Sequence, residues 1–160
     1  MKRLSAPMKS ILATSIAAGL LSCFSVSAFA DTQTTKFLIF LENGKQAGEQ
    51  IVQRQDDGLT KVSFIFKDNG RGPELKEEIR LGADGLVSEF KVTGTSTFGA
   101  PINENFRRQG NKAEWHSTSE KGSKQVDGSA LYIPLNSSFE TGSISISALA
   151  ARNGAPLPLL

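Results

Sequence analysis

The chain has 160 residues, of which 18 are basic, 16 are acidic and one is a histidine. One histidine cannot supply the several ligands of a catalytic zinc site, and no cluster of Lys and Arg with interleaved aromatic residues is present, which argues against nucleic-acid binding. This length predicts one domain with a hydrophobic core.

The first 30 residues have the features of a signal peptide. Lys2, Arg3 and Lys9 flank the start of an apolar segment over residues 11–21, and Ala28-Phe29-Ala30 places small residues where a signal peptidase cuts. The apolar segment is short and interrupted by Ser and Gly, so we expect no stable membrane span. We therefore predict cleavage after Ala30 and a periplasmic or secreted protein.

The alternative is a bacterial lipoprotein signal, Leu20-Leu21-Ser22-Cys23, in which Cys23 would carry the lipid. The apolar residues 24–30 argue against it, because a polar tether usually follows a lipidated cysteine. Of the 18 basic residues, three leave with the signal peptide, which leaves 15 against 16 acidic residues. The mature chain is thus nearly neutral, and its overall charge does not indicate a polyanionic partner. The cysteine also leaves, so we expect no disulfide.

From Thr34 onward, short apolar or alternating runs are separated by turn signals near residues 43, 57, 69, 84 and 110, as in β-hairpins. We expect strands over residues 36–42, 46–55, 59–67, 74–81, 86–95, 102–109, 112–120, 124–126 and 130–135. The first strand has apolar residues on both faces, which predicts cover on both sides.

The sharpest turn signal is Asp68-Asn69-Gly70-Arg71-Gly72-Pro73. Asn-Gly favours positive φ at both central residues, Gly72 adds a second permissive position, and Pro73 fixes φ where a strand begins. The next segment, residues 74–81, has an apolar period of two, although Leu75 and Ile79 also fit one face of a helix. The turn signal at residues 83–85 favours the strand.

Residues 136–140 are typical of a helix start, and Ile144, Ala148 and Leu149 then share one face before Asn153-Gly154. Alternating serines would equally suit a strand over residues 143–151. The apolar, proline-rich end at residues 156–160 predicts a chain that leads toward a further domain.

These patterns predict a mainly β fold: a signal peptide (1–30), an antiparallel meander that forms a sandwich or partly open barrel (31–135), and a helix or irregular segment (136–160).

Two acidic groups could suggest a site. Glu74, Glu77 and Glu78 lie near Lys76 and Arg80, and we interpret them as solvated surface charge rather than an acid–base pair or metal site. Residues 56–58, Asp-Asp-Gly, lack the further oxygen ligands of a calcium loop, and we interpret them as a turn.

The remaining candidates are also weak. His116 has no recognisable nucleophile or orienting partner, and strand alternation turns it away from the face of Trp115. Arg71 stands between two glycines and could clamp a carboxylate, but an exposed turn arginine is the simpler interpretation. The hydroxyl-rich residues 93–97 could line a polar groove, but they form no phosphate loop. We assign no catalytic, cofactor-binding or metal-ligating residue.

Several ordered stretches together carry a family resemblance. They are NGKQAGEQIVQR, DDG, FKDNGRGPELKEEIRLGADGL, FKVTGTSTFGAPINENF, AEWHSTSEKGS and ALYIPLN. The most specific are DNGRGP at residues 68–73 and TGTSTFGAP at residues 93–101. The set resembles the N-terminal β-rich region of secreted bacterial members of the metal-dependent amidohydrolase superfamily, those similar to imidazolonepropionase or prolidase.

The resemblance implies an accessory β-domain followed by a (β/α) barrel, in which His-x-His, a Lys, later histidines and an Asp hold one or two divalent metal ions for hydrolysis of C–N bonds. This chain has no His-x-His, so no family catalytic residue is carried over. We expect a non-catalytic accessory domain whose partner is a downstream catalytic barrel, with Leu157, Leu159 and Leu160 as candidate docking residues. The alternative is a free-standing periplasmic sandwich that binds a small or lipid-like ligand, and a third hypothesis is a hydrolase built on His116.

Overall fold

The computed structural model describes residues 32–126 and 128–160, so the predicted cleavage site after Ala30 and the alternative at Cys23 lie outside the described residues. Within these ranges, eight strands are followed by one helix. They are β1 (Gln33–Phe40), β2 (Gln46–Arg54), β3 (Thr60–Phe66), β4 (Glu74–Leu81), β5 (Val87–Thr95), β6 (Pro101–Gln109), β7 (Lys112–His116), β8 (Lys121–Gln125) and α1 (Phe139–Ala150).

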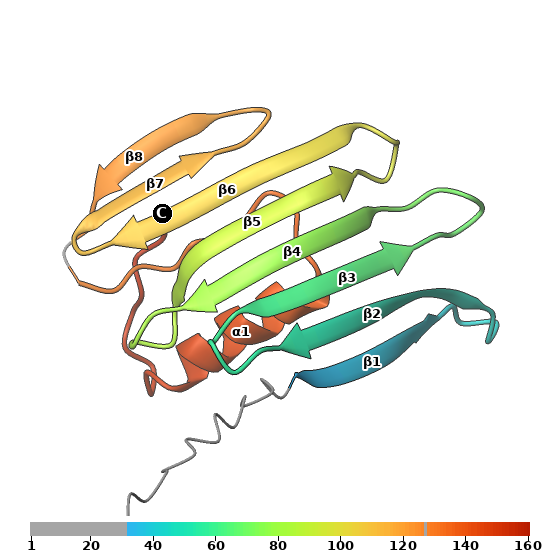
Figure 1. The fold of residues 1–160 in the computed structure, drawn as a ribbon, viewed down its shortest axis with the longest axis horizontal. Coiled ribbons are helices and arrows are strands. Elements are labelled where there is room, and N and C mark those ends of the chain that lie inside the picture. The colour runs from blue at the N-terminus through green and yellow to red at the C-terminus, as the bar shows by residue number, and fades with distance from the viewer. Residues whose placement is uncertain (1–31, 127) are drawn as a thin grey trace, which may run out of the picture.

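The eight strands lie side by side in one antiparallel sheet, in the same order as in the chain (Figure 1). The mainly β class and the meander are therefore confirmed. Residues 74–81 form the strand β4, as favoured from the sequence, and not the alternative helix. In place of the expected sandwich or partly open barrel, the structure has one open sheet with β1 and β8 at its edges. The reason is that α1 and its neighbouring segments supply the second layer that a second sheet would have supplied.

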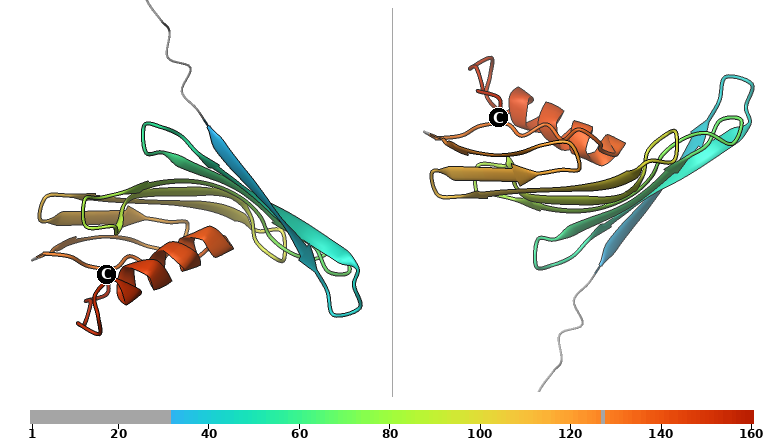
Figure 2. Two further views of the ribbon diagram at one scale, coloured as in Figure 1. Left: turned by 90° about the horizontal axis from the view of Figure 1, so that it is seen from below. Right: turned by 90° about the horizontal axis from the view of Figure 1, so that it is seen from above.

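The sheet is strongly twisted, and α1 lies against one of its two faces (Figure 2). We name this the covered face; its side chains include Val62 and Val92. The opposite side is the open face, and it carries Lys61, Glu78 and Lys91. Strand alternation therefore places most of the buried apolar side chains of the strands on the covered face, whereas Lys61, Glu78 and Lys91 lie on the open face.

The hydrophobic core lies between the covered face and the C-terminal segment, residues 128–160. Alternate strand residues supply most of it: Val52, Val62, Phe64, Leu75, Ile79, Val87, Phe90, Val92, Ile102, Phe106 and Ala113. From the C-terminal segment, the Tyr132 ring stacks on Phe106 with centroids 3.9 Å apart. Each fully buried aliphatic or aromatic side chain contributes about 1.5–3 kcal/mol to stability. Because most of these side chains lie on the covered face, packing on this face is the main apolar contribution to stability.

One strand prediction is wrong and another extends too far. Residues 130–135 do not join the sheet, and only a bridge from Leu131 to Leu159 is formed there. The strand predicted over 112–120 ends at His116, because the Ser117 hydroxyl accepts the N–H groups of Ser119 and Glu120 and starts a turn. Residues 124 and 125 of the short strand predicted at 124–126 lie in β8, which begins at Lys121 and ends at Gln125. β8 includes Gly122, where an added Cβ would lie 2.4 Å from the Trp115 ring.

The expectation that the first strand is covered on both sides is also wrong. Phe37, Leu38 and Phe40 are 49%, 48% and 56% exposed. The physical reason is position: β1 pairs only with β2 and forms an edge of the sheet.

The turn at Asn69-Gly70 is confirmed. Both residues have positive φ, 50° and 76°, as a tight two-residue hairpin turn requires. Asp68 and Arg71 close it by exchanging backbone hydrogen bonds of 2.8 and 2.9 Å. Gly72 follows with φ 148°, and a Cβ there would lie 1.9 Å from the carbonyl oxygen of Phe66. The backbone therefore needs glycine at this position for its space as well as its conformation.

Helix α1 settles residues 143–150 as helix, and Asn153 and Gly154 both adopt positive φ after its end. Ala148 is buried and Ile144 packs on the core, but Leu149 is 45% exposed, so it does not share their buried face as predicted.

The candidate docking leucines divide between two environments. Leu157 and Leu160 pack on the two core clusters, whereas Leu159 is exposed. The backbone of Leu131 receives a hydrogen bond from Leu160 N and donates one to Pro158 O. The apolar end of the chain is therefore largely engaged with the chain itself.

Glu77 holds the start of α1 on the covered face. The prediction that Glu77 is solvated is wrong, because this side chain is only 2% exposed and alternates with the exposed Glu78. Its carboxylate accepts hydrogen bonds from the Ser138 backbone N–H, the Ser138 hydroxyl at 2.7 Å and the Thr141 hydroxyl at 3.1 Å. A strand carboxylate thus satisfies donors at a helix N-terminus, where negative charge is also favoured by the helix dipole.

Two more buried polar side chains of the sheet hold the same segment. Gln50 accepts the Phe139 N–H at 3.1 Å, and Glu104 accepts the Tyr132 hydroxyl and the Leu135 N–H. These hydrogen bonds hold the C-terminal segment in one position on the sheet, in addition to its apolar contacts. A shift of the segment would leave buried donors unpaired, which costs about 1–3 kcal/mol for each donor.

We predict that Gly72→Ala lowers the free energy of unfolding by about 2 kcal/mol or more, because the new Cβ meets a backbone oxygen and φ is unfavourable. Gly142→Ala is the control, since its Cβ meets nothing in the helix, and we expect a gain of about 0.5–1 kcal/mol. Urea denaturation measures both. Equal effects of the two substitutions would contradict the tight approach at Gly72.

We predict that Glu77→Leu lowers the free energy of unfolding by about 3 kcal/mol, because donors of Ser138 and Thr141 lose their acceptor. Glu77→Gln retains an acceptor oxygen and should cost much less.

Burial raises the pKa of Glu77. The contribution of the Glu77 carboxyl to the free energy of unfolding is therefore full below its pKa in the unfolded chain, and it declines as pH rises through its pKa in the folded protein. The Glu77→Gln variant should therefore become more stable relative to the parent protein as pH rises over this range, and urea denaturation at several pH values tests this. A parent protein that instead becomes more stable relative to Glu77→Gln as pH rises would contradict the prediction.

Candidate functional site

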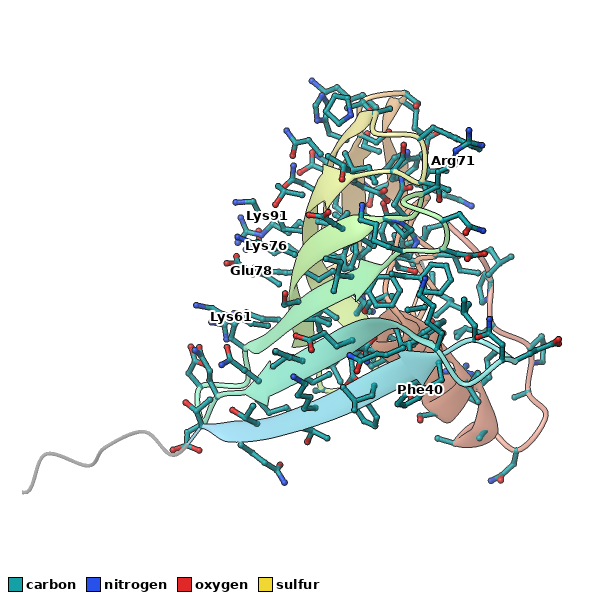
Figure 3. The ribbon with its side chains drawn as sticks, turned by 90° about the vertical axis from the view of Figure 1, so that its right-hand side faces the viewer. Phe40, Lys61, Arg71, Lys76, Glu78 and Lys91 are labelled. Carbon is teal, nitrogen blue, oxygen red and sulfur yellow. The ribbon has the colours of Figure 1, made fainter. Side chains whose placement is uncertain are left out.

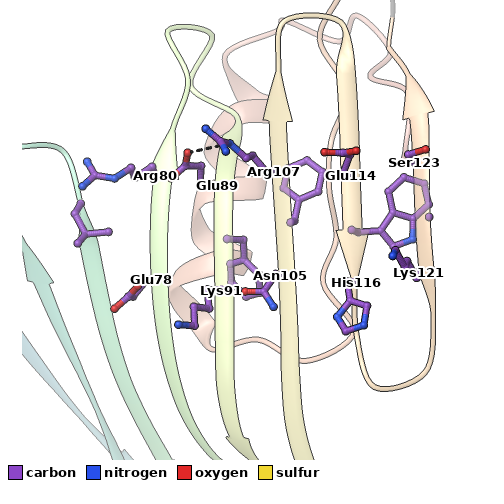
Figure 4. Close-up of a pocket in the computed structure, with 15 residues that line it drawn as sticks. Glu78, Arg80, Glu89, Lys91, Asn105, Arg107, Glu114, His116, Lys121 and Ser123 are labelled. Atoms are coloured by element: carbon purple, nitrogen blue, oxygen red, sulfur yellow. Dashed lines mark ion pairs between the residues drawn. The ribbon is translucent and has the colours of Figure 1, made fainter.

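The strand register places polar side chains of the open face in rows that run across the strands. One row joins directly opposed residues of β3 to β8; we name it the lysine row, and it consists of Lys61, Glu78, Lys91, Asn105, His116 and Lys121. Directly opposed residues have Cβ atoms about 4.5–5.5 Å apart. The labelled members from Glu78 to Lys121 follow one another in Figure 4.

A second row lies beside it on the same face. We name it the ion-paired row; it consists of Arg80, Glu89, Arg107, Glu114 and Ser123. Arg107 Nε lies 3.5 Å from Glu89 Oε1, and Glu114 Oε1 lies 2.5 Å from Lys112 Nζ. Arg80 Nη2 lies 2.8 Å from Asp57 Oδ2 in the β2–β3 turn. The charges of this row are thus matched by partners within the chain.

The matched charges shift the acids that take part. The hydrogen bond from Arg80, followed by one from the Leu59 N–H, holds the pKa of Asp57 below its ordinary value. The hydrogen bond from Lys112 lowers the pKa of Glu114 in the same way. Both acids stay ionised well below neutral pH, so the row remains neutralised under ordinary conditions.

A broad groove follows these rows. The open face of β4 to β8 is hollowed to a volume of about 1010 Å³, and a smaller hollow of about 370 Å³ lies over β2 to β5. Glu78 and Lys91 line both hollows, so the two meet at the lysine row. The groove is therefore continuous over most of the sheet.

The lysines in and beside this row differ from the neighbouring cations. Lys61, Lys91 and Lys121, together with Lys76 beside the row, take part in none of the ion pairs among the described residues. Figure 3 shows Lys61, Lys76, Glu78 and Lys91 projecting from the same side of the sheet. The open face therefore carries four lysines that take part in none of the ion pairs among the described residues.

His116 lies on the open face and is exposed, as strand alternation predicted. Its opposed neighbours are Asn105 and Lys121, which are not carboxylates that could orient an imidazole base. In the described part of the chain, no group of three His, Cys, Asp or Glu residues could hold a metal ion. The arrangement offers hydrogen-bond donors and charges that can bind a ligand or a partner.

The other candidates lie elsewhere. Arg71 is exposed in its turn, away from the two rows, and takes part in no ion pair within the described residues. Asp57 accepts the Leu59 N–H at 3.0 Å, which confirms a turn at residues 56–58. Thr93 borders the smaller hollow, so part of the hydroxyl-rich stretch does reach the groove.

Sequence reasoning missed the residues that matter most. Glu77 and Glu104 are buried on the covered face, and period-two alternation with Leu75 and Ile79 was a signal for Glu77. The lysine row was missed because its members are far apart in the sequence and meet only through the strand register.

Comparison with protein-family models, curated proteins and solved structures finds no match to this chain. Over the described residues, no helix combines the length and the apolarity needed to cross a membrane. The resemblance to the amidohydrolase superfamily therefore stays a prediction.

We predict that the Asp57 carboxyl titrates below its ordinary pKa of 3.8 and that Arg80→Met returns it toward that value, because the hydrogen bond from Arg80 is the main cause of the shift. Arg107→Met is the control and should leave Asp57 unchanged, since Arg107 pairs with Glu89. Carboxyl NMR signals followed through a pH titration measure this. If Arg80→Met leaves the pKa of Asp57 unchanged, this would contradict the assignment of Asp57 as the partner that matches the charge of Arg80 in the ion-paired row.

Proposed function

We propose that this chain is a secreted, non-catalytic accessory domain whose open face docks on a catalytic partner. The observation that carries the proposal is the contrast between the two faces of the sheet. The covered face is sealed by the C-terminal segment through Glu77 and Glu104. The open face keeps a continuous polar groove with uncompensated charge.

The chemistry of the open face supports binding rather than catalysis. His116 has no orienting carboxylate opposite it, and Glu78 stands between two lysines rather than beside a second acid. General acid–base catalysis requires a titrating group within hydrogen-bond reach of a partner or substrate proton. A rigid sheet that presents fixed polar groups is instead well suited to recognition.

For the partner, we propose the metal-binding barrel of an amidohydrolase-like enzyme that hydrolyses C–N bonds. The support is the ordered resemblance over the stretches 68–73 and 93–101. The turn at Asn69-Gly70 and the close approach at Gly72 give the first stretch a structural role. The divalent metal and its ligands would belong to the barrel, and the periplasmic or secreted location rests on the signal-peptide pattern.

A second candidate function is a free-standing periplasmic domain that binds a small ligand. The groove volume of about 1010 Å³ favours it, because small-molecule sites occupy about 300–1,000 Å³. Charged side chains such as Arg80 and Lys91 line the groove, which suits a polar ligand better than a lipid-like one.

The first test is the coding frame beyond the Leu160 codon. We expect it to encode a strand ending in His-x-His and the rest of a barrel. A stop codon directly after Leu160 would contradict the accessory assignment and favour the free-standing alternative.

The second test uses that barrel as a separate protein, mixed with residues 32–160. We expect a complex in calorimetry, and Asn105→Trp should weaken it by roughly tenfold by obstructing the centre of the open face. Lys45→Trp, in the exposed β1–β2 turn, is the control and should have little effect. Hydrolysis of C–N bonds by residues 32–160 alone, lost in His116→Ala, would contradict a non-catalytic domain.

A further inference from the structure

Positive charge along the lysine row is not matched within the chain. Three lysines, Lys61, Lys91 and Lys121, stand against the single acid Glu78. Lys76 lies two residues before Glu78 on β4 and adds a fourth cation beside the row. Because the charges of the ion-paired row are matched by partners within the chain, the lysine row is the one of these two rows that carries excess positive charge.

We infer that the lysine row is a binding site for an acidic segment of a protein partner, whose Asp and Glu carboxylates pair with Lys61, Lys91 and Lys121. The inference rests on the proposed function in taking the open face as the binding surface. It goes beyond that function by assigning the residues and the charge of the partner. Charge complementarity of this kind sets the partner and the docking register more than it sets raw affinity.

The spacing of the lysines fits an extended segment that crosses the strands. Lys61 and Lys91 are two strands apart, which is roughly 10 Å, and Lys121 is three strands further, roughly 14 Å. Asn105 and His116 fill the interval with groups that can donate hydrogen bonds. Residues on one side of an extended chain repeat about every 7 Å, so several carboxylates of one segment can reach the row.

The same register argues against a nucleic acid as the occupant. Single-stranded nucleic acids are bound by stacking of bases on exposed aromatic rings. Phe106 and Trp115 border the larger hollow, but they oppose each other on the covered face and pack on the core. The row itself has no such ring apart from His116. Lysine ammonium groups can pair with single carboxylates of a protein without stacking.

The experiment compares two triple variants of residues 32–160. The row variant is Lys61→Gln, Lys91→Gln and Lys121→Gln. The control variant is Lys45→Gln, Arg71→Gln and Lys124→Gln, which removes the same charge from exposed positions outside the row. Thermal unfolding establishes that both variants are folded. The probe is poly-L-glutamate, titrated by calorimetry at low and at physiological ionic strength.

We expect the row variant to bind poly-L-glutamate roughly tenfold more weakly at low ionic strength, with a shallower salt dependence, because three charge pairs are lost. The control variant should change less than about twofold. Equal losses in both variants would show diffuse attraction to the whole surface and overturn the inference. No loss in the row variant would do the same. Tighter binding of the parent to a single-stranded oligonucleotide or to heparin would overturn the assignment of a protein segment.

These outcomes separate the inference from the proposed function. Row-dependent binding of poly-L-glutamate together with a stop codon after Leu160 supports the acidic partner and removes the barrel as that partner. A barrel that binds the row variant as tightly as the parent overturns the lysine row and keeps the accessory assignment.

Discussion

The structure depends on one carboxylate buried in a sheet. Glu77 stands among apolar residues on the covered face, yet it binds the first residues of α1 through Ser138 and Thr141. An isolated charge in such a place would be strongly unfavourable, so the site is stable only while the helix start supplies its donors. The helix has no side-chain cap of its own and depends on the same contact. The helix start therefore supplies donors to the buried carboxylate of the sheet, and the carboxylate supplies an acceptor to the helix start. This reciprocal contact determines which face of the sheet the helix covers.

That choice determines where binding can occur. Once the C-terminal segment occupies the covered face, the sheet itself can meet a partner only through its open face and its two edges, β1 and β8. The side chains of the open face stand on a regular antiparallel sheet, so their spacing is set by backbone hydrogen bonds rather than by loops. A binding surface of this kind is rigid in register and adaptable only in its long side chains, which is the character expected for charge-guided docking.

Much of this fold could be predicted from the sequence, because alternation and turn chemistry are local. Asn69-Gly70 fixed a hairpin by conformational need alone. The sandwich was wrong because the number of strands does not show how many sheets they form, and the second layer came from residues 128–160. Glu77 was misjudged as one of three adjacent acids, although its alternation with Leu75 and Ile79 placed it inward. The lysine row was beyond prediction, since it depends on the register of six strands.

The nearly neutral charge of residues 31–160 conceals this asymmetry. Fifteen basic and sixteen acidic residues average to almost nothing, but the sum says little when acids such as Glu77 and Glu104 lie inside. Buried acids do not screen the open face as surface acids would, because the core and the sheet separate them from it. The lysines beside Glu78 therefore act on a partner at short range, while the neutral total provides little long-range attraction. A surface of this kind discriminates between partners through short-range contacts, because it exerts little non-selective attraction on anions at long range.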